Sequence, residues 1–446
     1  YNLAKPYINA IKKGELPMSD LDDKARRILR LNFRTNNGWG PGRMTCPDHM
    51  KTAHDIAQEA VTLLKNEGAV LPLDPAKKLT IAVIGENATR TLVKAGGSSE
   101  LKPKYEIAPL DGIRNEFPNA NIEYATGYTS GPAFYGFAPA PKEDQAKLKA
   151  EAVELAQKAD LVIYVGGLNK NYQQDCEGGD RTAYELPFNQ DALISALADV
   201  NKNMVVVLAS GNAYSMPWID KVPAVVQAWY LGSESGNVVA EVLCGKINPS
   251  GKLPFSFPVK LEDSAPHSFN DPMVYPGVDH QEIYKEDILV GYRWHDTKGI
   301  KPLFPFGFGL SYTTFEYSKP TVKATKDGFI ATVTVKNTGK VAGKEAVELY
   351  VSAPKGTIYK PESELKAYAK TRLLEPGESQ VLTFSVTNYE LASFHNDSHS
   401  WIGDKGTYTV KFGASVEDIR ATASYRLAKD YVKVEHEVFI PTMSLD

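Results

Sequence analysis

Five short runs of apolar, mostly β-branched residues constrain the fold of this chain more than any other feature of its sequence. Runs of this kind are typical of strands that are buried on both faces of a sheet. Helix-like stretches such as residues 147–159 alternate with them, and a further helix is expected from about His54 to Lys65. The alternation predicts an α/β fold with a mostly parallel sheet sandwiched by helices. The runs are Leu79–Gly85, Asn121–Gly127, Leu161–Leu168, Met204–Gly211 and Ala224–Gly232.

The pattern changes from about Glu316 onward to a strict alternation of apolar and polar residues. Short strands of this kind, separated by turns rich in Asn, Pro and Gly, predict an all-β sandwich over residues 316–446. Residues 259–315 have weak periodicity and are expected to form an irregular connecting segment. Its aromatic residues could stack on sugar rings, but we expect them chiefly to pack against a core: Tyr275, Tyr284, Tyr292 and Trp294.

The polar loop that follows the third apolar run holds the main candidate for chemistry. Glu177 lies in it next to Gly178 and Gly179, and the loop ends at Leu186-Pro187. Ligands of open α/β sheets bind beyond the carboxyl ends of the strands, where this side chain would lie. An exposed loop carboxylate is usually only solvated, however, and the spacing alone leaves both interpretations open.

Several motifs together resemble glycoside hydrolase family 3. The pattern Glu177-Gly178-Gly179-Asp180-Arg181, followed by Leu186-Pro187 and Gln190, resembles the family's acid/base loop. Four other segments agree with the family in order: Ala60–Leu73, Ala228–Pro258, Val290–Asp296 and Phe304–Phe315. The resemblance implies the end of a (β/α) barrel and a linker in residues 1–50, an α/β sandwich domain in residues 51–258, and a fibronectin type III-like domain after the connecting segment.

The resemblance implies a retaining, β-glucosidase-like hydrolase that removes non-reducing terminal β-linked sugars from an oligosaccharide or β-glucoside. Glu177 would protonate the leaving oxygen and then activate water. An alkoxide leaves poorly without a proton, and the acid and the nucleophile of a retaining enzyme lie roughly 5 Å apart around one anomeric carbon. Burial or an ionised nucleophile nearby is expected to raise the pKa of the acid. Asp175 is the competing candidate for the acid.

The nucleophile implied by the resemblance is absent from this sequence. In the family it is an Asp in a Ser-Asp-Trp-like strand end, upstream of all the matching segments. Ser19-Asp20 is the one Ser-Asp pair near the start, and Ser19 with Asp22 predicts the N-cap of a helix instead. The chain is therefore expected to supply the acid/base but not the nucleophile, and to be inactive alone. The missing barrel would come in cis or as a second chain.

Four further residues are candidates for the site. Ser98 and Ser99 belong to a Gly-Gly-Ser-Ser loop, where bare backbone and hydroxyl groups suit sugar binding, although a plain surface turn is equally compatible with the pattern. Asp180 and Arg181 are expected to support the acid loop. The alternatives to a β-glucosidase are a β-xylosidase and a non-catalytic carbohydrate-binding or scaffold protein.

Composition argues against several other classes of function. The net charge is −4 and there is no basic run, so no nucleic-acid partner is expected. Apolar runs are strand-sized, which argues against a membrane span. Gly85 lacks the other glycines of a dinucleotide-binding loop, the three cysteines have no metal-ligand spacing, and hydrolysis by two carboxylates needs neither cofactor nor metal. A surface made to fit a barrel would expose apolar area, and a homodimer is one association it would permit.

Overall fold

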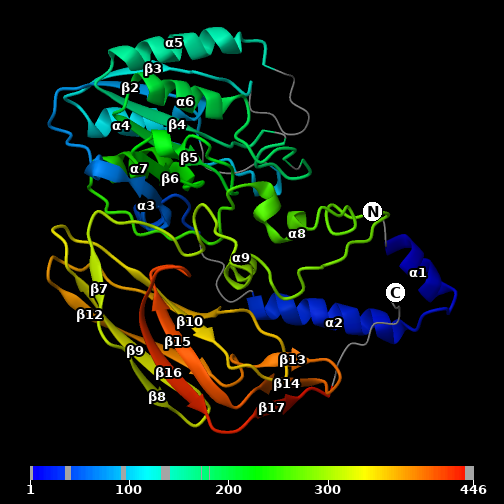
Figure 1. Ribbon diagram of the computed structural model, residues 1–446. Coiled ribbons are helices and arrows are strands. Elements are labelled where there is room, and N and C mark those ends of the chain that lie inside the picture. Colours follow the sequence, from blue (N-terminus) through cyan, green and yellow to red (C-terminus); the bar gives the residue numbers. More distant parts are fainter. Residues whose placement is uncertain are drawn as a thin grey trace. The chain divides into compact units, whose positions relative to one another are not determined.

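The computed structural model describes residues 4–35, 42–91, 97–131, 141–171, 173–179 and 181–436, apart from the side chain of Ser99. The chain divides into two compact units between Lys51 and Thr52. Figure 1 shows the helices and strands by their labels. Helices α1 (Ala4–Lys12) and α2 (Met18–Thr35) form the first unit, with the start of α3 (Pro47–Ala60).

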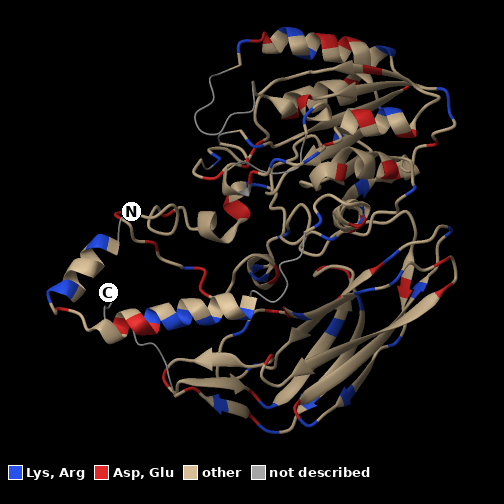
Figure 2. Cartoon of the chain, turned by 180° about the vertical axis from the view of Figure 1, so that it is seen from behind, with Lys and Arg blue, Asp and Glu red and all other residues tan. Residues whose placement is uncertain are grey.

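Helix α2 is amphipathic, and neither it nor α1 contains a buried residue. Its apolar side chains are exposed, Ile28 and Phe33 among them. The charged residues of α2 are acidic near its start and basic after that (Figure 2). Asp23 accepts a hydrogen bond from Arg27 at 2.7 Å. The predicted N-cap at Ser19 is wrong: the helix begins at Met18, because the Asp20 N–H already bonds to the Pro17 carbonyl at 3.2 Å.

A six-stranded sheet forms the centre of the second unit, in the order β1-β6-β5-β4-β2-β3. All neighbouring strands are parallel except the pair of β1 and β6, so the predicted α/β class is confirmed. The predicted helix over His54–Lys65 is partly wrong, because α3 ends at Ala60 and the next residues form β1 at the sheet edge. The strands are β1 (Thr62–Asn66), β2 (Thr80–Ile84), β3 (Asn121–Ala125), β4 (Leu161–Gly167), β5 (Met204–Ala209) and β6 (Ala224–Gln227).

Helices cover both faces of this sheet, as the apolar runs predict. Alternate residues of β2, β4 and β5 pack with α5 and α6 into one core cluster, and the residues between them pack with α3, α4 and α7 into a second cluster. Every residue of β4 is buried, which explains its continuous apolar sequence. The helices are α4 (Pro109–Glu116), α5 (Gln145–Lys158), α6 (Gln190–Val200) and α7 (Ser235–Leu243).

The carboxyl-terminal part of the chain is a β-sandwich with a core of its own. One sheet has the order β11-β10-β15-β16, the other has the order β12-β9-β7 with β8 paired to β9, and β13-β14-β17 form a small third sheet. The strands are β7 (Phe315–Tyr317), β8 (Thr321–Ala324), β9 (Gly328–Asn337), β10 (Ala346–Ser352), β11 (Glu364–Lys370), β12 (Ser379–Thr387), β13 (Ser393–His395), β14 (Ser400–Gly403), β15 (Gly406–Gly413), β16 (Ile419–Leu427) and β17 (Tyr431–Val434).

The connecting segment contains two short helices, α8 (Ala265–Ser268) and α9 (Tyr292–Lys298), and packs against both domains. The core role expected of its aromatic residues fits Tyr292 and Trp294, which are buried. Tyr275 and Tyr284 are 45% and 70% exposed, so the expectation fails for them. The Tyr292 ring joins Tyr350 of β10 in a small apolar cluster, which anchors the segment to the sandwich.

A buried carboxyl, Glu348 of β10, lies where the segment meets the sandwich. It accepts a hydrogen bond from the Tyr350 hydroxyl, and a Cβ atom at Gly307 would collide with its carboxylate. Gly307 also has a φ of +81°, a conformation that favours glycine. Burial raises the pKa of Glu348 to about 7, although Tyr350 and Lys252 oppose the shift.

We expect this carboxyl to make stability depend on pH. Between its ordinary pKa of 4.5 and its native pKa of about 7, the folded chain keeps a proton that the unfolded chain releases. The free energy of unfolding therefore falls as pH rises through this window. Glu348→Gln should remove this pH-dependent contribution. In urea unfolding, the free energy of unfolding of the variant relative to the unsubstituted chain should therefore rise by up to about 3 kcal/mol between pH 4.5 and 7. A difference that stays constant with pH would contradict the prediction.

Candidate functional site

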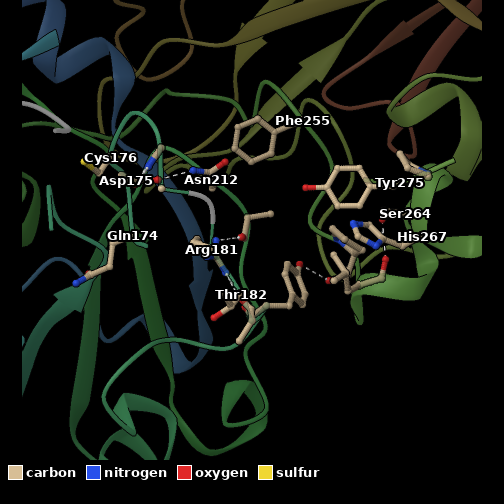
Figure 3. Close-up of a pocket in the computed structure, with 18 of the residues that line it drawn as sticks. Gln174, Asp175, Cys176, Arg181, Thr182, Asn212, Phe255, Ser264, His267 and Tyr275 are labelled. Atoms are coloured by element: carbon tan, nitrogen blue, oxygen red, sulfur yellow. Dashed lines mark hydrogen bonds between the residues drawn. The ribbon is translucent and has the colours of Figure 1, made fainter. Parts of the chain in front are cut away.

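The carboxyl ends of the five parallel strands meet at one edge of the sheet. A pocket lies at this edge. Its volume is about 970 Å³. One wall comes from the loops after β4, β5 and β6, with Asp175, Arg181 and Asn212 (Figure 3). The opposite wall comes from the start of the connecting segment, with His267 and Tyr275.

Glu177 lines this pocket with an exposed side chain. Its Oε2 atom accepts a hydrogen bond from the backbone N–H of Ser98 at 2.6 Å and another from the Ser98 hydroxyl. These two bonds, the hydroxyl first, hold the pKa of Glu177 below its ordinary value, with only a weaker opposing effect of burial. A raised pKa was expected for the acid. In this chain the shift has the opposite sign, because the carboxylate is exposed and hydrogen-bonded rather than buried.

The other predicted site residues have different positions. Ser98 directs both of its donors at Glu177. Ser99 belongs to the same short helical turn (Gly97–Ser99), and its side chain lies outside the described part of the structure, as does the whole of Asp180. The roles expected of Ser99 and Asp180 therefore stay predictions.

Arg181, in the same loop as Glu177, is half-buried and donates to three backbone carbonyls. The acceptors are Ala213 at 2.7 Å, Tyr184 at 2.9 Å and Ala183 at 3.2 Å. Burial lowers the pKa of Arg181, and the nearby charge of Asp175 acts against this. Since Ala213 lies in the loop after β5, the guanidinium joins two loops of the pocket.

Asp175, the competing acid, is 7% exposed, and its two oxygens accept three hydrogen bonds. The donors are the Gly211 N–H at 2.7 Å, the Tyr230 hydroxyl at 2.6 Å and the amide of Asn212. Donors from two neighbouring loops hold both oxygens, so this side chain has little freedom to turn toward a substrate. Its geometry suits a structural role, the fastening of the acid loop to the loops after β5 and β6.

A second buried carboxylate, Glu86, supports the acid loop from the other side. It accepts from Arg90 at 2.6 Å, from the Thr129 hydroxyl at 2.6 Å and from both donors of Ser130. The Ser130 hydroxyl in turn accepts from Asn169 at 3.1 Å, and the Asn169 carbonyl accepts the N–H of Asp175 at 3.0 Å. The network therefore joins the segments after β2, β3 and β4 to the residue that fastens the acid loop.

Sequence reasoning missed several of these supports. Glu86 and Asn212 belong to none of the motifs named above, and Tyr230 lies in the family-like segment Ala228–Pro258 but is not among the predicted site residues. Each follows the end of a strand within a few residues, which is the signal that could have found it. Asp191 also has a pKa raised to about 6 by burial, but it lies outside the pocket and bonds to Trp218 and to the N–H of Leu186. Its perturbed pKa marks a structural contact at the end of the acid loop.

Within the described ranges, no group of three or more His, Cys, Asp or Glu side chains could hold a metal ion. The three cysteines are free. No helix in the described part of the chain is long and apolar enough to cross a membrane.

Comparison with known proteins identifies the family. The model of the glycosyl hydrolase family 3 C-terminal domain matches residues 61–312, and that of the fibronectin type III-like domain matches residues 345–416. The chain belongs to glycosyl hydrolase family 3. The predicted resemblance is thereby confirmed, and so is the predicted fibronectin type III-like domain.

Relatives and solved structures of the family agree with this assignment. Beta-glucosidase BoGH3A of Bacteroides ovatus is 49% identical over 95% of this chain, and thermostable beta-glucosidase B of Acetivibrio thermocellus is 39% identical over 95%. The crystal structure of Bifidobacterium adolescentis GH3 beta-glucosidase matches this chain with a TM-score of 0.84 and 32% identity. The match covers 99% of this chain and 62% of the Bifidobacterium chain. The matches span 58% and 54% of the two curated relatives, so this chain corresponds to little more than half of their length.

Two acidic residues that lie two positions apart should respond differently to substitution. Asp175→Asn leaves buried donors without a charged acceptor and should lower the free energy of unfolding by about 2–3 kcal/mol. Glu177→Gln is the matched control, because its exposed carboxylate should contribute no more than about 0.5 kcal/mol. Denaturant unfolding of both variants measures the difference. Equal losses would show that Asp175 does not fasten the loop.

Proposed function

We propose that this chain carries the acid/base half of a retaining β-glucosidase, with Glu177 as the proton donor and acceptor. The observation that carries the proposal is the position of Glu177. It is an exposed carboxylate in the segment that resembles the family's acid/base loop, and it lines a pocket at the carboxyl edge of the sheet. Family membership and the names of the relatives support the choice of reaction.

The proposed chemistry has two steps at one anomeric carbon. In the first, the protonated Glu177 gives its proton to the glycosidic oxygen while the bond from that oxygen to carbon breaks and a nucleophilic carboxylate bonds to the carbon. In the second, the ionised Glu177 takes a proton from water as the water oxygen displaces the nucleophile. Each step leaves Glu177 in the form that the other step needs.

The second carboxylate of this mechanism is proposed to lie on a barrel outside these 446 residues. Among the described residues that line the pocket, the other carboxylate is Asp175, and both of its oxygens are held by donors from neighbouring loops. It is therefore a poor nucleophile. We infer a partner barrel that is covalently continuous with this chain or supplied as a second chain.

Glucose is the proposed sugar. Both relatives compared above are named beta-glucosidases. A second candidate is an arabinopyranose, since relatives from Bifidobacterium breve and Bifidobacterium longum, each 33% identical, are named exo-alpha-(1->6)-L-arabinopyranosidase. A β-xylosidase remains the third alternative.

A panel of 4-nitrophenyl glycosides of the three sugars, assayed on a protein that includes the barrel, separates these substrates by kcat/KM. Binding of sugars without turnover would favour the scaffold alternative.

The 446-residue chain should show no hydrolysis of 4-nitrophenyl β-glucoside above the buffer rate. A retaining mechanism needs a nucleophile roughly 5 Å from the acid, and Glu177 has none in the proposed arrangement. The release of nitrophenolate is measured with the isolated chain and with the same chain plus the barrel. If the isolated chain turns over substrate and Glu177→Gln abolishes the activity, the nucleophile belongs to this chain and the proposal of a partner barrel is wrong.

Chemical rescue should separate the two acids in the protein with its barrel. Without a base to activate water, Glu177→Gln should lose about 100-fold or more in kcat, and azide should restore turnover by attacking the anomeric carbon without needing deprotonation. Asp175→Asn should not respond to azide, because it acts through loop geometry. The glycosyl azide product is detected by mass spectrometry. Rescue of Asp175→Asn alone would reverse the assignment.

A further inference from the structure

We propose that Ser98 is a positioning residue for Glu177, which fixes Oε2 of the carboxylate and leaves Oε1 as the oxygen that exchanges the proton. The inference rests on the proposed function of Glu177. It also revises the role expected of Ser98, from a direct contact with the sugar to the orientation of the acid/base.

The geometry of the contact is specific to one oxygen. The Ser98 backbone N–H and the Ser98 hydroxyl both donate to Oε2, and within the described part of the structure no hydrogen bond reaches Oε1. The loop also approaches very closely, since a Cβ atom at Gly97 would collide with the Cβ atom of Glu177. Gly97 has a φ of +91°, so both its backbone conformation and its surroundings require glycine.

An ion pair fastens the same two loops at a second point. Lys170, which follows β4, donates to Glu100 at 2.8 Å. Glu100 lies two residues after Ser98, and Lys170 lies seven residues before Glu177. Two attachments between one pair of loops limit their relative movement more than one attachment would. The contact between Ser98 and Glu177 is therefore one of two contacts that hold these two loops together.

The electrostatics of the site agree with this arrangement. The lowered pKa of Glu177 has the two bonds from Ser98 as its causes, and the weak effect of burial opposes it. Lys170 and Glu100 neutralise each other across the same loops. The other titratable groups that line the pocket are Asp175, Cys176, Arg181, His267 and the tyrosines Tyr184, Tyr230 and Tyr275. None of them is a cause of the shift, so substitution of Ser98 should act on this pKa directly.

The contact is compatible with both protonation states that the reaction needs. In the neutral acid, the proton sits on Oε1 and Oε2 is a carbonyl oxygen, which still accepts from Ser98. In the first step Oε1–H gives its proton to the glycosidic oxygen as the bond from that oxygen to carbon breaks. In the second step Oε1 takes a proton from the attacking water. Ser98 therefore keeps one orientation of Glu177 through both steps, and favours the ionised form.

The first test measures the pKa of Glu177 directly and needs no catalytic activity. Side-chain carbon NMR of the 446-residue chain, with the Glu177 signal assigned from Glu177→Gln, follows the titration of this carboxyl. Ser98→Ala should raise the pKa, because one donor to the charged form is lost, and Ser98→Thr should keep it low. Ser264→Ala is the control: its hydroxyl also lines the pocket but donates to the Leu261 carbonyl. An unchanged pKa in Ser98→Ala would overturn the inference.

The second test measures catalysis in the protein with its barrel. The alkaline limb of kcat/KM reports the ionisation of the acid in the free enzyme, so Ser98→Ala should move this limb to higher pH and Ser98→Thr should restore it. The maximum of kcat should fall roughly three- to tenfold in Ser98→Ala, because the acid loses its fixed orientation. A sugar-binding role alone would raise KM, leave the limb in place and leave the pKa of Glu177 unchanged in the NMR titration, and this combination would overturn the inference.

The two tests together distinguish the failure of this inference from the failure of the proposed function. A pKa that rises in the NMR titration while the kinetic limb stays in place means that Ser98 controls Glu177 but that Glu177 is not the acid of the reaction. That outcome overturns the proposed function. A pKa that does not rise overturns the role of Ser98 and leaves the acid/base assignment to the azide experiment.

Discussion

The buried carboxylate of Asp175 determines the position of the acid loop. Its three donors come from the loops after β5 and β6, so one side chain joins segments that only the order of strands in the sheet brings together. Glu86 does the same on the other side, through Ser130 and Asn169. A buried polar group that loses a hydrogen-bond partner costs free energy, so the loss of one partner should weaken the whole network. The exposed Glu177 has a defined position because its buried neighbours do.

Asp175 and Glu177 lie two residues apart, and their different surroundings, not their chemistry, suit them to different roles. Asp175 is buried and accepts three hydrogen bonds through both oxygens, whereas Glu177 is exposed and bound through one oxygen. Both side chains line the pocket, but donors from neighbouring loops hold both oxygens of Asp175, whereas only one oxygen of Glu177 is held. Identity as Asp or Glu would not have assigned these roles.

The sequence predicted the architecture well because periodicity is a local property. The five parallel strands follow from their apolar runs, and the sandwich strands follow from their alternation. The same reasoning failed at β1, because Val61–Lys65 continues the helical spacing of α3 and only the pairing with β6 makes it a strand. It also missed the contacts of the site. Ser98 lies 79 residues from Glu177, and Tyr230 lies 55 residues from Asp175, so no local pattern records them.

The lowered pKa of Glu177 is the sum of effects that a covering surface would change. A barrel packed over the pocket would exclude water and place an ionised nucleophile nearby, and both effects raise the pKa of a carboxyl. The two bonds from Ser98 act in the opposite direction. A group that must be an acid in one step and a base in the next works best with a pKa near the operating pH, which requires such opposing effects. In the proposed mechanism the contact with Ser98 supplies the effect that lowers the pKa of Glu177, and the proposed barrel would supply the effects that raise it.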